Sequence, residues 1–196
     1  GAVWDAAIGM AAIGGIAITP VKFGISFTLS HLNQAGALVH VYTDGSVLLN
    51  HGGTEMGQGL YIKVAQVVAE EFGIDAGRVR ITATTTAKVP NTSATAASSG
   101  ADMNGMAAKQ AAAIIRGRLT DFAAKTWKVP KTRIRFENGQ VIIGNHSLSF
   151  GDLAKKAHQA RISMSSTGFY ATPKIAWDRA KGKGRPFFYF AYGAAC

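Results

Sequence analysis

The sequence predicts an α+β fold in which mixed β-sheets pack against helices. Two dipeptides with strong hairpin preference, Asp44-Gly45 and Asn138-Gly139, each predict a β-hairpin, and the first joins two arms rich in β-branched residues. Residues 59–72 and 101–127 instead carry helical patterns. The strand, helix and strand patterns that follow one another between residues 37 and 86 suit a right-handed crossover between neighbouring strands.

The first half of the chain alternates strand and helix patterns. Residues 16–27 form a strand-like run that Pro20 interrupts, and residues 37–49 form the two arms of the first hairpin. The helix of residues 59–72 stops at Gly73 and presents one apolar stripe, made of Leu60, Val64, Val67, Val68 and Phe72. Residues 78–86 alternate as a strand does.

The second half opens with the long alanine-rich helix of residues 101–127, which Pro130 ends. Residues 133–144 form the second hairpin, and a short helix begins at residues 149–152 and runs to Arg161. The final residues, 162–196, are strand-like and aromatic, with a turn at residues 181–184.

The composition indicates a globular chain with an uneven charge. The 196 residues are 47% hydrophobic, enough for one domain with a core, and the net charge is +10. Residues 1–100 hold five Lys or Arg against six acidic residues, whereas residues 101–196 hold sixteen against five. Because these basic clusters lack interleaved aromatic residues and a recognised binding motif, we interpret them as a solvated face or a surface for acidic neighbours in preference to a nucleic-acid-binding surface.

Cysteine usage and the N-terminal residues restrict the remaining classes. Cys196 is the single cysteine, which excludes an intrachain disulfide and any all-cysteine iron–sulfur or zinc site and suits the reducing cytoplasm. Residues 1–15 are apolar but lack the basic start of a signal peptide, and their glycines make them too short a run to span a bilayer. We therefore expect a cytoplasmic protein with no membrane partner.

The Gly-Gly-Thr-Glu-Met-Gly-Gln-Gly motif at residues 52–59 stands between a strand pattern and a helix pattern. Such a turn is expected to present free backbone N–H groups and the positive end of a helix dipole, which suit an anionic ligand. Gly57 and Gly59 remove the Cβ atoms that would block close approach, and Gln58 offers an uncharged amide. The alternative is a purely structural turn, because the motif lacks the Lys-Ser/Thr ending of a P-loop.

A second loop, residues 90–100, consists of small residues and carries five hydroxyl groups. It is either a linker in which Ser98 or Ser99 caps the next helix, or a ligand-binding loop whose hydroxyls and amides bind a polar edge. His31 and His51 lack a partner at metal-ligand spacing, so we interpret both as ordinary polar residues.

Five segments together resemble the molybdenum-binding subunit of xanthine dehydrogenase: residues 23–28, 32–36, 41–46, 52–59 and 89–98. Over residues 15–115 the motifs occur in the family's order and at the family's spacing, and the resemblance resumes at residues 165–170 and 190–196. It implies that residues 1–196 are an interior part of a molybdopterin-binding domain. Within it we distinguish a poorly matched segment (1–14), a portion with the cofactor and substrate loops (15–127), and a portion with a hairpin, a short helix and aromatic strands (128–196).

The resemblance implies roles for particular residues. Phe27 and Thr28 match the family's substrate-binding phenylalanine and threonine. The implied cofactor-binding residues are Gly57, Gln58, Gly59, Ala97 and Ser98, and the backbone of Ala97 would approach the molybdenum. The family's catalytic glutamate lies in a Gly-Glu-Pro-like motif that this chain lacks, so no catalytic residue is assigned. We interpret Glu55 as structural, because a carboxylate beside an anionic cofactor would be repelled.

The resemblance also implies a reaction, the hydroxylation of hypoxanthine or xanthine with oxygen derived from water. The molybdenum–molybdopterin cofactor would bind here, while [2Fe-2S] clusters and FAD would bind other domains or subunits and pass electrons to NAD or oxygen. The remaining molybdenum-domain segments would be partners, and the chain alone is expected to be inactive. Two alternatives remain, a non-catalytic pterin- or nucleotide-binding module and a basic nucleic-acid-binding module.

Overall fold

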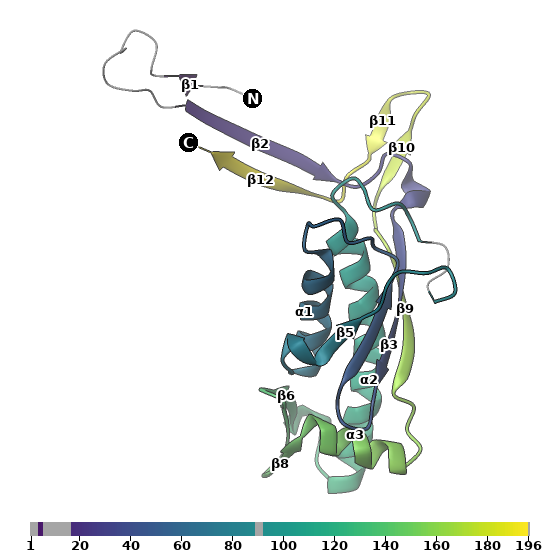
Figure 1. The fold of residues 1–196 in the computed structure, drawn as a ribbon. Helices are drawn as coiled ribbons and strands as arrows, with labels where there is room; N and C mark the ends of the chain where they lie inside the picture. Colours follow the sequence, from purple (N-terminus) through teal and green to yellow (C-terminus); the bar gives the residue numbers. More distant parts are fainter. Residues whose placement is uncertain (1–3, 6–16, 89–91, 196) are drawn as a thin grey trace. The chain divides into compact units, whose positions relative to one another are not determined.

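The structure, a computed structural model, describes residues 4–5, 17–88 and 92–195. The chain divides into two compact units (Figure 1). We call residues His31–Ala171 the core unit, and Gly1–Ser30 together with Thr172–Cys196 the ribbon unit. Each is described by itself.

The core unit is built on a four-stranded sheet with the order β5-β4-β3-β9. Strand β3 (Gln34–Val41) is antiparallel to both β4 (Val47–His51) and β9 (Ser165–Ala171). The predicted hairpin at Asp44-Gly45 is confirmed. Gly45 has a φ of 79°, and the Asp44 carboxylate accepts hydrogen bonds from the backbone N–H and the hydroxyl of Ser46, at 2.9 and 2.6 Å.

Two helices, α1 (Leu60–Phe72) and α2 (Gly100–Trp127), pack side by side against this sheet (Figure 1). Both helices were predicted, and α1 ends at Gly73 in the left-handed conformation, as expected. The buried side of β3 faces the helices through Ala35, Ala37, Val39 and Val41. In the described part of the chain, no helix is both long and apolar enough to cross a bilayer.

The predicted crossover brings β5 (Val79–Ile81) beside β4 in parallel. The strand predicted for residues 78–86 is wrong beyond Ile81, because threonine side chains replace the backbone ladder there. The hydroxyl of Thr82 donates to the side-chain oxygen of Asn50, and that of Thr84 lies 3.1 and 3.0 Å from the carbonyl oxygens of His51 and Gly53.

A smaller three-stranded sheet of order β6-β7-β8 completes the core unit. The predicted second hairpin joins β6 (Ile134–Glu137) and β7 (Gln140–Ile143), with φ values of 52° at Asn138 and 73° at Gly139. Strand β8 (His146–Ser149) was not predicted. It leads into α3 (Phe150–Gln159), where the Ser149 hydroxyl caps the backbone N–H of Asp152 at 3.0 Å.

Three 3₁₀ turns occur in the described residues: η1 (Ser30–Leu32), η2 (Ala76–Arg78) and η3 (Lys131–Arg133).

The ribbon unit is organised by β2 (Ala17–Ile25), which pairs with β12 (Tyr189–Ala195) and, at its first two residues, with β1 (Trp4–Asp5). Pro20 was expected to interrupt the first strand, but β2 continues through it, opposite Ala194. Proline is tolerated there because, along this part of β2, the described residues provide a pairing strand on one side only.

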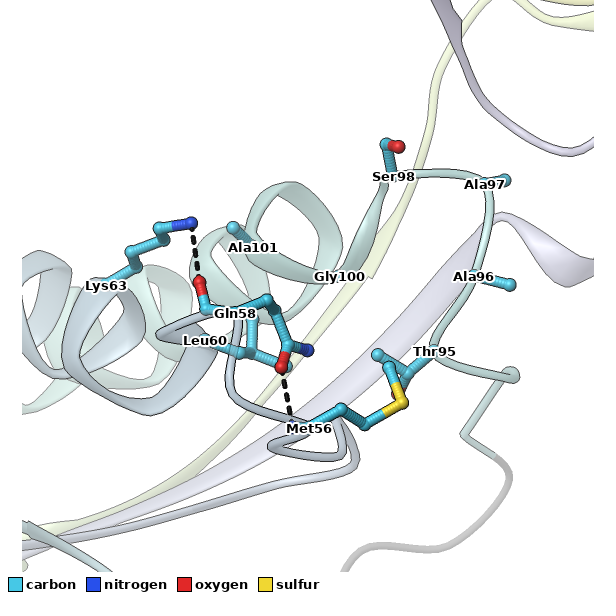
Figure 2. A pocket seen from close by; sticks show the side chains of 10 residues that line it. All are labelled: Met56, Gln58, Leu60, Lys63, Thr95, Ala96, Ala97, Ser98, Gly100 and Ala101. Carbon is cyan, nitrogen blue, oxygen red and sulfur yellow. Dashed lines mark hydrogen bonds between the residues drawn. The ribbon is translucent and has the colours of Figure 1, made fainter.

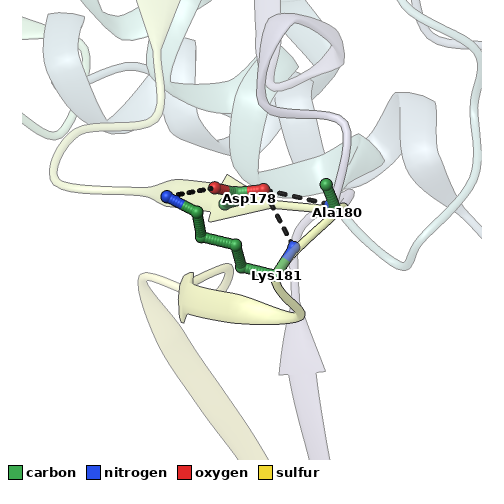
Figure 3. A network of polar contacts seen from close by, with 3 residues as sticks. All are labelled: Asp178, Ala180 and Lys181. Atoms are coloured by element: carbon green, nitrogen blue, oxygen red, sulfur yellow. Dashed lines mark hydrogen bonds and ion pairs between the residues drawn. The ribbon is translucent and has the colours of Figure 1, made fainter.

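A short hairpin of β10 (Ala176–Asp178) and β11 (Lys183–Arg185) belongs to the same unit. Figure 3 shows how Asp178 closes its turn, with one carboxylate oxygen accepting from the backbone N–H groups of Ala180 and Lys181 at 3.0 and 3.1 Å. The Lys181 ammonium lies 3.8 Å from the other oxygen. A turn is present, but it spans residues 179–182 and not the predicted 181–184, because Lys183 and Gly184 pair with β10 as part of β11.

Candidate functional site

The glycine-rich turn, residues 52–59, connects β4 to α1, and its glycines serve two different purposes. A Cβ on Gly53 would lie 2.5 Å from the Leu60 side chain and 2.8 Å from that of Asn104, so this glycine allows close packing. Gly57 and Gly59 have φ values of 96° and 73°, yet a Cβ would meet nothing within 4 Å at Gly57 and only Ile62 at 3.7 Å at Gly59. The turn therefore leaves open space above its second half.

The carboxylate of Glu55 occupies the backbone N–H groups of Gly57 and Gly59 in this turn and of Tyr61 in α1. One oxygen accepts from Gly57 and Gly59 at 2.9 and 3.0 Å, and the other accepts from Tyr61 at 3.0 Å. The bonds from Tyr61, Gly57 and Gly59 lower the pKa of Glu55. The prediction that the turn offers these N–H groups to an anionic ligand is therefore wrong, and the structural interpretation of Glu55 agrees with the geometry.

The side chain of Gln58 is exposed but folds back onto its own turn. Its oxygen accepts from the backbone N–H of Met56 at 2.6 Å (Figure 2). Its NH2 group donates to the carbonyl oxygen of Thr54 at 2.9 Å. Both bonds are to exposed backbone, so a ligand with a donor and an acceptor can replace them.

The second loop, residues 92–99, carries backbone in an unusual conformation. Ala97 and Ser98 both have a φ of 54°, in the left-handed region that non-glycine residues seldom adopt. The backbone N–H and the hydroxyl of Ser99 both donate to the carbonyl oxygen of Ala96, at 3.3 and 3.0 Å. Ser99 stands at the start of α2, but its hydroxyl does not cap the helix, contrary to the capping alternative. The loop's first predicted residues, 90–91, lie outside the described residues.

The turn and the loop meet. The Thr95 hydroxyl accepts from the backbone N–H of Thr54 at 2.9 Å, which ties them together. Between them lies a pocket of about 460 Å³ (Figure 2). It is lined by Met56, Gln58, Leu60, Lys63, Thr95, Ala96, Ala97, Ser98, Gly100 and Ala101. The predicted residues Gln58, Ala97 and Ser98 are thus brought to one site, with Gly57 and Gly59 in the adjoining turn.

Lys63 is a lining residue that the sequence analysis missed. It lies on α1 four residues after Gly59, and its ammonium donates to the carbonyl oxygen of Gln58 at 3.0 Å (Figure 2). The other described residues that line the pocket are uncharged, so Lys63 is the charged group among them. Its position one turn into a helix that follows a glycine-rich turn is the signal that could have identified it.

His51 is buried and binds the first half of the turn. Its ring is 1% exposed, and Nδ1 accepts from the backbone N–H of Gly53 at 3.1 Å. Burial lowers its pKa to about 4, so the imidazole is neutral near pH 7. Within the described residues, no three His, Cys, Asp or Glu side chains gather to hold a metal ion.

Phe27 and Thr28 belong to the ribbon unit, where they follow the end of β2. Phe27 is half-buried and Thr28 is exposed. Their role at a substrate remains a prediction.

Comparison with known proteins identifies the family. The family model for the molybdopterin cofactor-binding domain matches residues 5–196. The chain belongs to this family. Relatives of this molybdopterin cofactor-binding chain include xanthine dehydrogenase/oxidase of Mus musculus, 48% identical over 182 residues, and xanthine dehydrogenase of Oryza sativa subsp. japonica, 48% identical over 181 residues. The alignments cover 93% and 92% of the chain but 12% of each relative.

Solved structures share the fold of this molybdopterin cofactor-binding chain. Quinoline 2-oxidoreductase from Pseudomonas putida 86 superposes with a TM-score of 0.71 at 19% identity, covering 89% of this chain and 26% of the other. CO dehydrogenase from Oligotropha carboxidovorans gives a TM-score of 0.70 at 20% identity, covering 80% and 21%. The predicted α+β fold is confirmed.

Proposed function

We propose that the pocket between the glycine-rich turn and the loop of residues 92–99 holds part of the molybdopterin cofactor in a complete xanthine dehydrogenase-like enzyme. That enzyme would oxidise hypoxanthine or xanthine with oxygen derived from water. The observation that carries the proposal is the convergence of these two segments on a pocket in which Lys63 is the one charged residue among the described lining residues.

The residues present fit an anionic, flat cofactor. Lys63 supplies a positive charge for a phosphate group, and none of the described residues that line the pocket carries a carboxylate. Ala96, Ala97, Gly100 and Ala101 have side chains small enough to let a ring system approach the backbone. Gln58 adds one donor and one acceptor at the same wall.

Each of these residues binds or orients the cofactor. When bound, the molybdenum cofactor supplies the redox chemistry and the activation of water-derived oxygen. Lys63 would neutralise negative charge, and Gln58 would exchange its two backbone bonds for bonds to the cofactor. Phe27 and Thr28 would hold the purine through ring contact and a hydroxyl bond.

The remaining parts of the enzyme would come from outside this chain. These are the other molybdenum-domain segments with the general-base glutamate, and the domains or subunits that carry [2Fe-2S] clusters and FAD. NAD or oxygen would be the final acceptor.

The test uses the complete protein, assayed for molybdenum, pterin and xanthine oxidation. Lys63→Met removes the charge but nearly keeps the length of the side chain. We expect it to weaken cofactor binding about tenfold, because a charge-assisted bond is lost. Lys109→Met is the matched control, because Lys109 is exposed on α2 and does not line the pocket. Equal molybdenum and pterin contents in the two variants would contradict the assignment of the pocket.

Two substitutions at the facing walls complete the test. Gln58→Ala is expected to lower molybdenum content or turnover, and Ala97→Phe to fill the pocket and block the site. A complete enzyme with Ala97→Phe and normal kinetics would show that the loop lies away from the chemistry.

A further inference from the structure

We propose that Glu55 is a positioning residue. Its carboxylate holds the glycine-rich turn in the ligand-binding conformation before any cofactor binds. The inference concerns the turn itself and rests on the proposed function only for what the turn then holds.

The geometry of the carboxylate supports this role. One oxygen bridges the backbone N–H groups of Gly57 and Gly59, and the second oxygen takes that of Tyr61, with all three distances between 2.9 and 3.0 Å. The carboxylate therefore joins both sides of Gln58 to the first turn of α1. Bonds from N–H groups to an ionised acceptor are about twice as strong as neutral ones.

The turn needs such support at Gly57 and Gly59, because the bonds of Gln58 to Met56 and Thr54 do not involve the N–H groups of these two glycines. Gly57 and Gly59 carry no side chain, and a Cβ built on Gly57 would meet no described atom within 4 Å. Glycine loses more conformational freedom on ordering than any other residue. The helix α1 begins after Gly59, which offers no side-chain cap, so a carboxylate from Glu55 replaces the missing cap and complements the helix dipole.

The consequence for the site is that Glu55 holds the backbone while Gln58 and Lys63 face the ligand. The three N–H groups already donate to Glu55 and are not available to an incoming anion. What the turn presents is the Gln58 amide, with Lys63 anchored to the Gln58 carbonyl oxygen at 3.0 Å. Glu55 thus fixes where the two ligand-facing groups stand without lining the pocket itself.

The lowered pKa of Glu55 agrees with this geometry, because the bond from Tyr61 and then those from Gly57 and Gly59 favour the charged carboxylate.

The experiment follows hydrogen–deuterium exchange of residues 52–62, resolved to single amides, in the complete protein produced without cofactor. Glu55→Ala is expected to raise the exchange rates at Gly57, Gly59 and Tyr61 about tenfold, the order expected when bonds to a charged acceptor are lost. Glu55→Gln should be intermediate. Its one oxygen can still bridge Gly57 and Gly59, but its NH2 group cannot accept from Tyr61.

The matched control is Glu70→Gln, which removes the same charge from an exposed site on α1, the helix that follows the turn. It should leave these amides unchanged. If Glu55→Ala exchanges no faster at the three amides than this control, the proposal is overturned, as it also is if Glu55→Gln exchanges at Tyr61 as slowly as the unmodified protein.

A separate measurement distinguishes this inference from the proposed function. The unmodified complete protein, produced with cofactor, is assayed for molybdenum and pterin. An absence of both would contradict the proposed function and leave the exchange result intact. Faster exchange in Glu55→Ala together with a lowered cofactor content supports both.

Discussion

The His51 imidazole is neutral in the folded chain because burial disfavours its charged form. Burial lowers its pKa from 6.5 to about 4. Nδ1 accepts the N–H of Gly53, and the ring meets that of Tyr61 edge-on, with centroids 5.3 Å apart. Protonation would place a charge at a site that gives Nε2 no hydrogen-bond partner among the described residues.

We therefore predict an acid-sensitive stability that depends on His51. Since the folded pKa lies below the unfolded value of 6.5, the unfolded chain binds the proton first. Stability should fall as the pH drops below 6.5, with the full loss, about 3 kcal/mol, reached below about pH 4. His51→Asn keeps an acceptor for Gly53 but does not titrate. Urea unfolding across this pH range should show a smaller acid loss for the variant, and parallel profiles would contradict the prediction.

The left-handed backbone at Ala97 and Ser98 costs stability. An L-residue in this region is less stable by about 1–2 kcal/mol, because its Cβ approaches the following carbonyl oxygen. Such backbone persists where the surrounding structure over-determines it, often at ligand sites. Here the bonds from Ser99 to Ala96 and the tie from Thr54 to Thr95 hold the loop.

Ala97→Gly should therefore stabilise the chain by about 0.5–1 kcal/mol, the relief of strain less the added freedom of the unfolded glycine. The matched control is Ala113→Gly, the same change at an exposed position inside α2, which should destabilise by about 1 kcal/mol. Thermal or urea unfolding measures both. Destabilisation of similar size in the two variants would show that the φ of 54° at Ala97 carries no strain.

The site residues differ in how far the sequence could predict them. Gln58, Ala97 and Ser98 stand in distinctive motifs, so their grouping at one pocket was predictable. Lys63 was missed because a lysine one turn into a helix resembles any solvated residue. The three bonds of Glu55 were missed because sequence spacing cannot show which backbone N–H groups a flexible side chain will reach.

At the scale of elements, the contact between α2 and β9 depends on Gly168. A Cβ there would lie 2.1 Å from the carbonyl oxygen of Ala107 and 2.7 Å from the backbone nitrogen of Ala111. The side chains that α2 buries include several alanines, so the helix backbone comes close to the strand. A methyl group cannot fit without separating the two elements.

Gly168→Ala should destabilise the chain by about 3 kcal/mol, since the clash is with rigid helix backbone. The matched control is Gly117→Ala in α2, where a Cβ meets nothing within 4 Å. That change should stabilise by up to about 1 kcal/mol, because alanine favours the helix interior. A Gly168→Ala chain whose unfolding free energy stays within about 1 kcal/mol of the original would refute the close approach.

Elements with local signals were predictable, and those decided by tertiary contacts were not. Both hairpins carry turn residues with positive φ, and α1 ends at a left-handed glycine. Strand β5 is shorter than its alternating pattern because Thr82 and Thr84 bond to Asn50 and to neighbouring backbone instead. Strand β8 has only four residues, and its pairing with β7 places it in the sheet.

At the scale of the whole molecule, burial is concentrated in one unit. The buried hydrophobic residues among those described run from Ala35 to Met164, all within the core unit. The ribbon unit instead exposes large apolar side chains on both faces of its strand pair, among them Val21, Phe23 and Tyr192. A ribbon of two long strands is at best marginally stable by itself.

This distribution predicts that residues 31–171 fold without the rest of the chain. Their free energy of unfolding should stay within about 1 kcal/mol of that of the 196-residue chain, because the ribbon adds little burial. Urea unfolding of the two polypeptides provides the comparison, with circular dichroism reporting the helices. A loss of more than about 3 kcal/mol on removing the ribbon unit would show that the core depends on it, since marginal domains have only about 5–15 kcal/mol in total. Retained stability would make the core unit, with the whole pocket lining, the smallest piece on which cofactor binding can be measured.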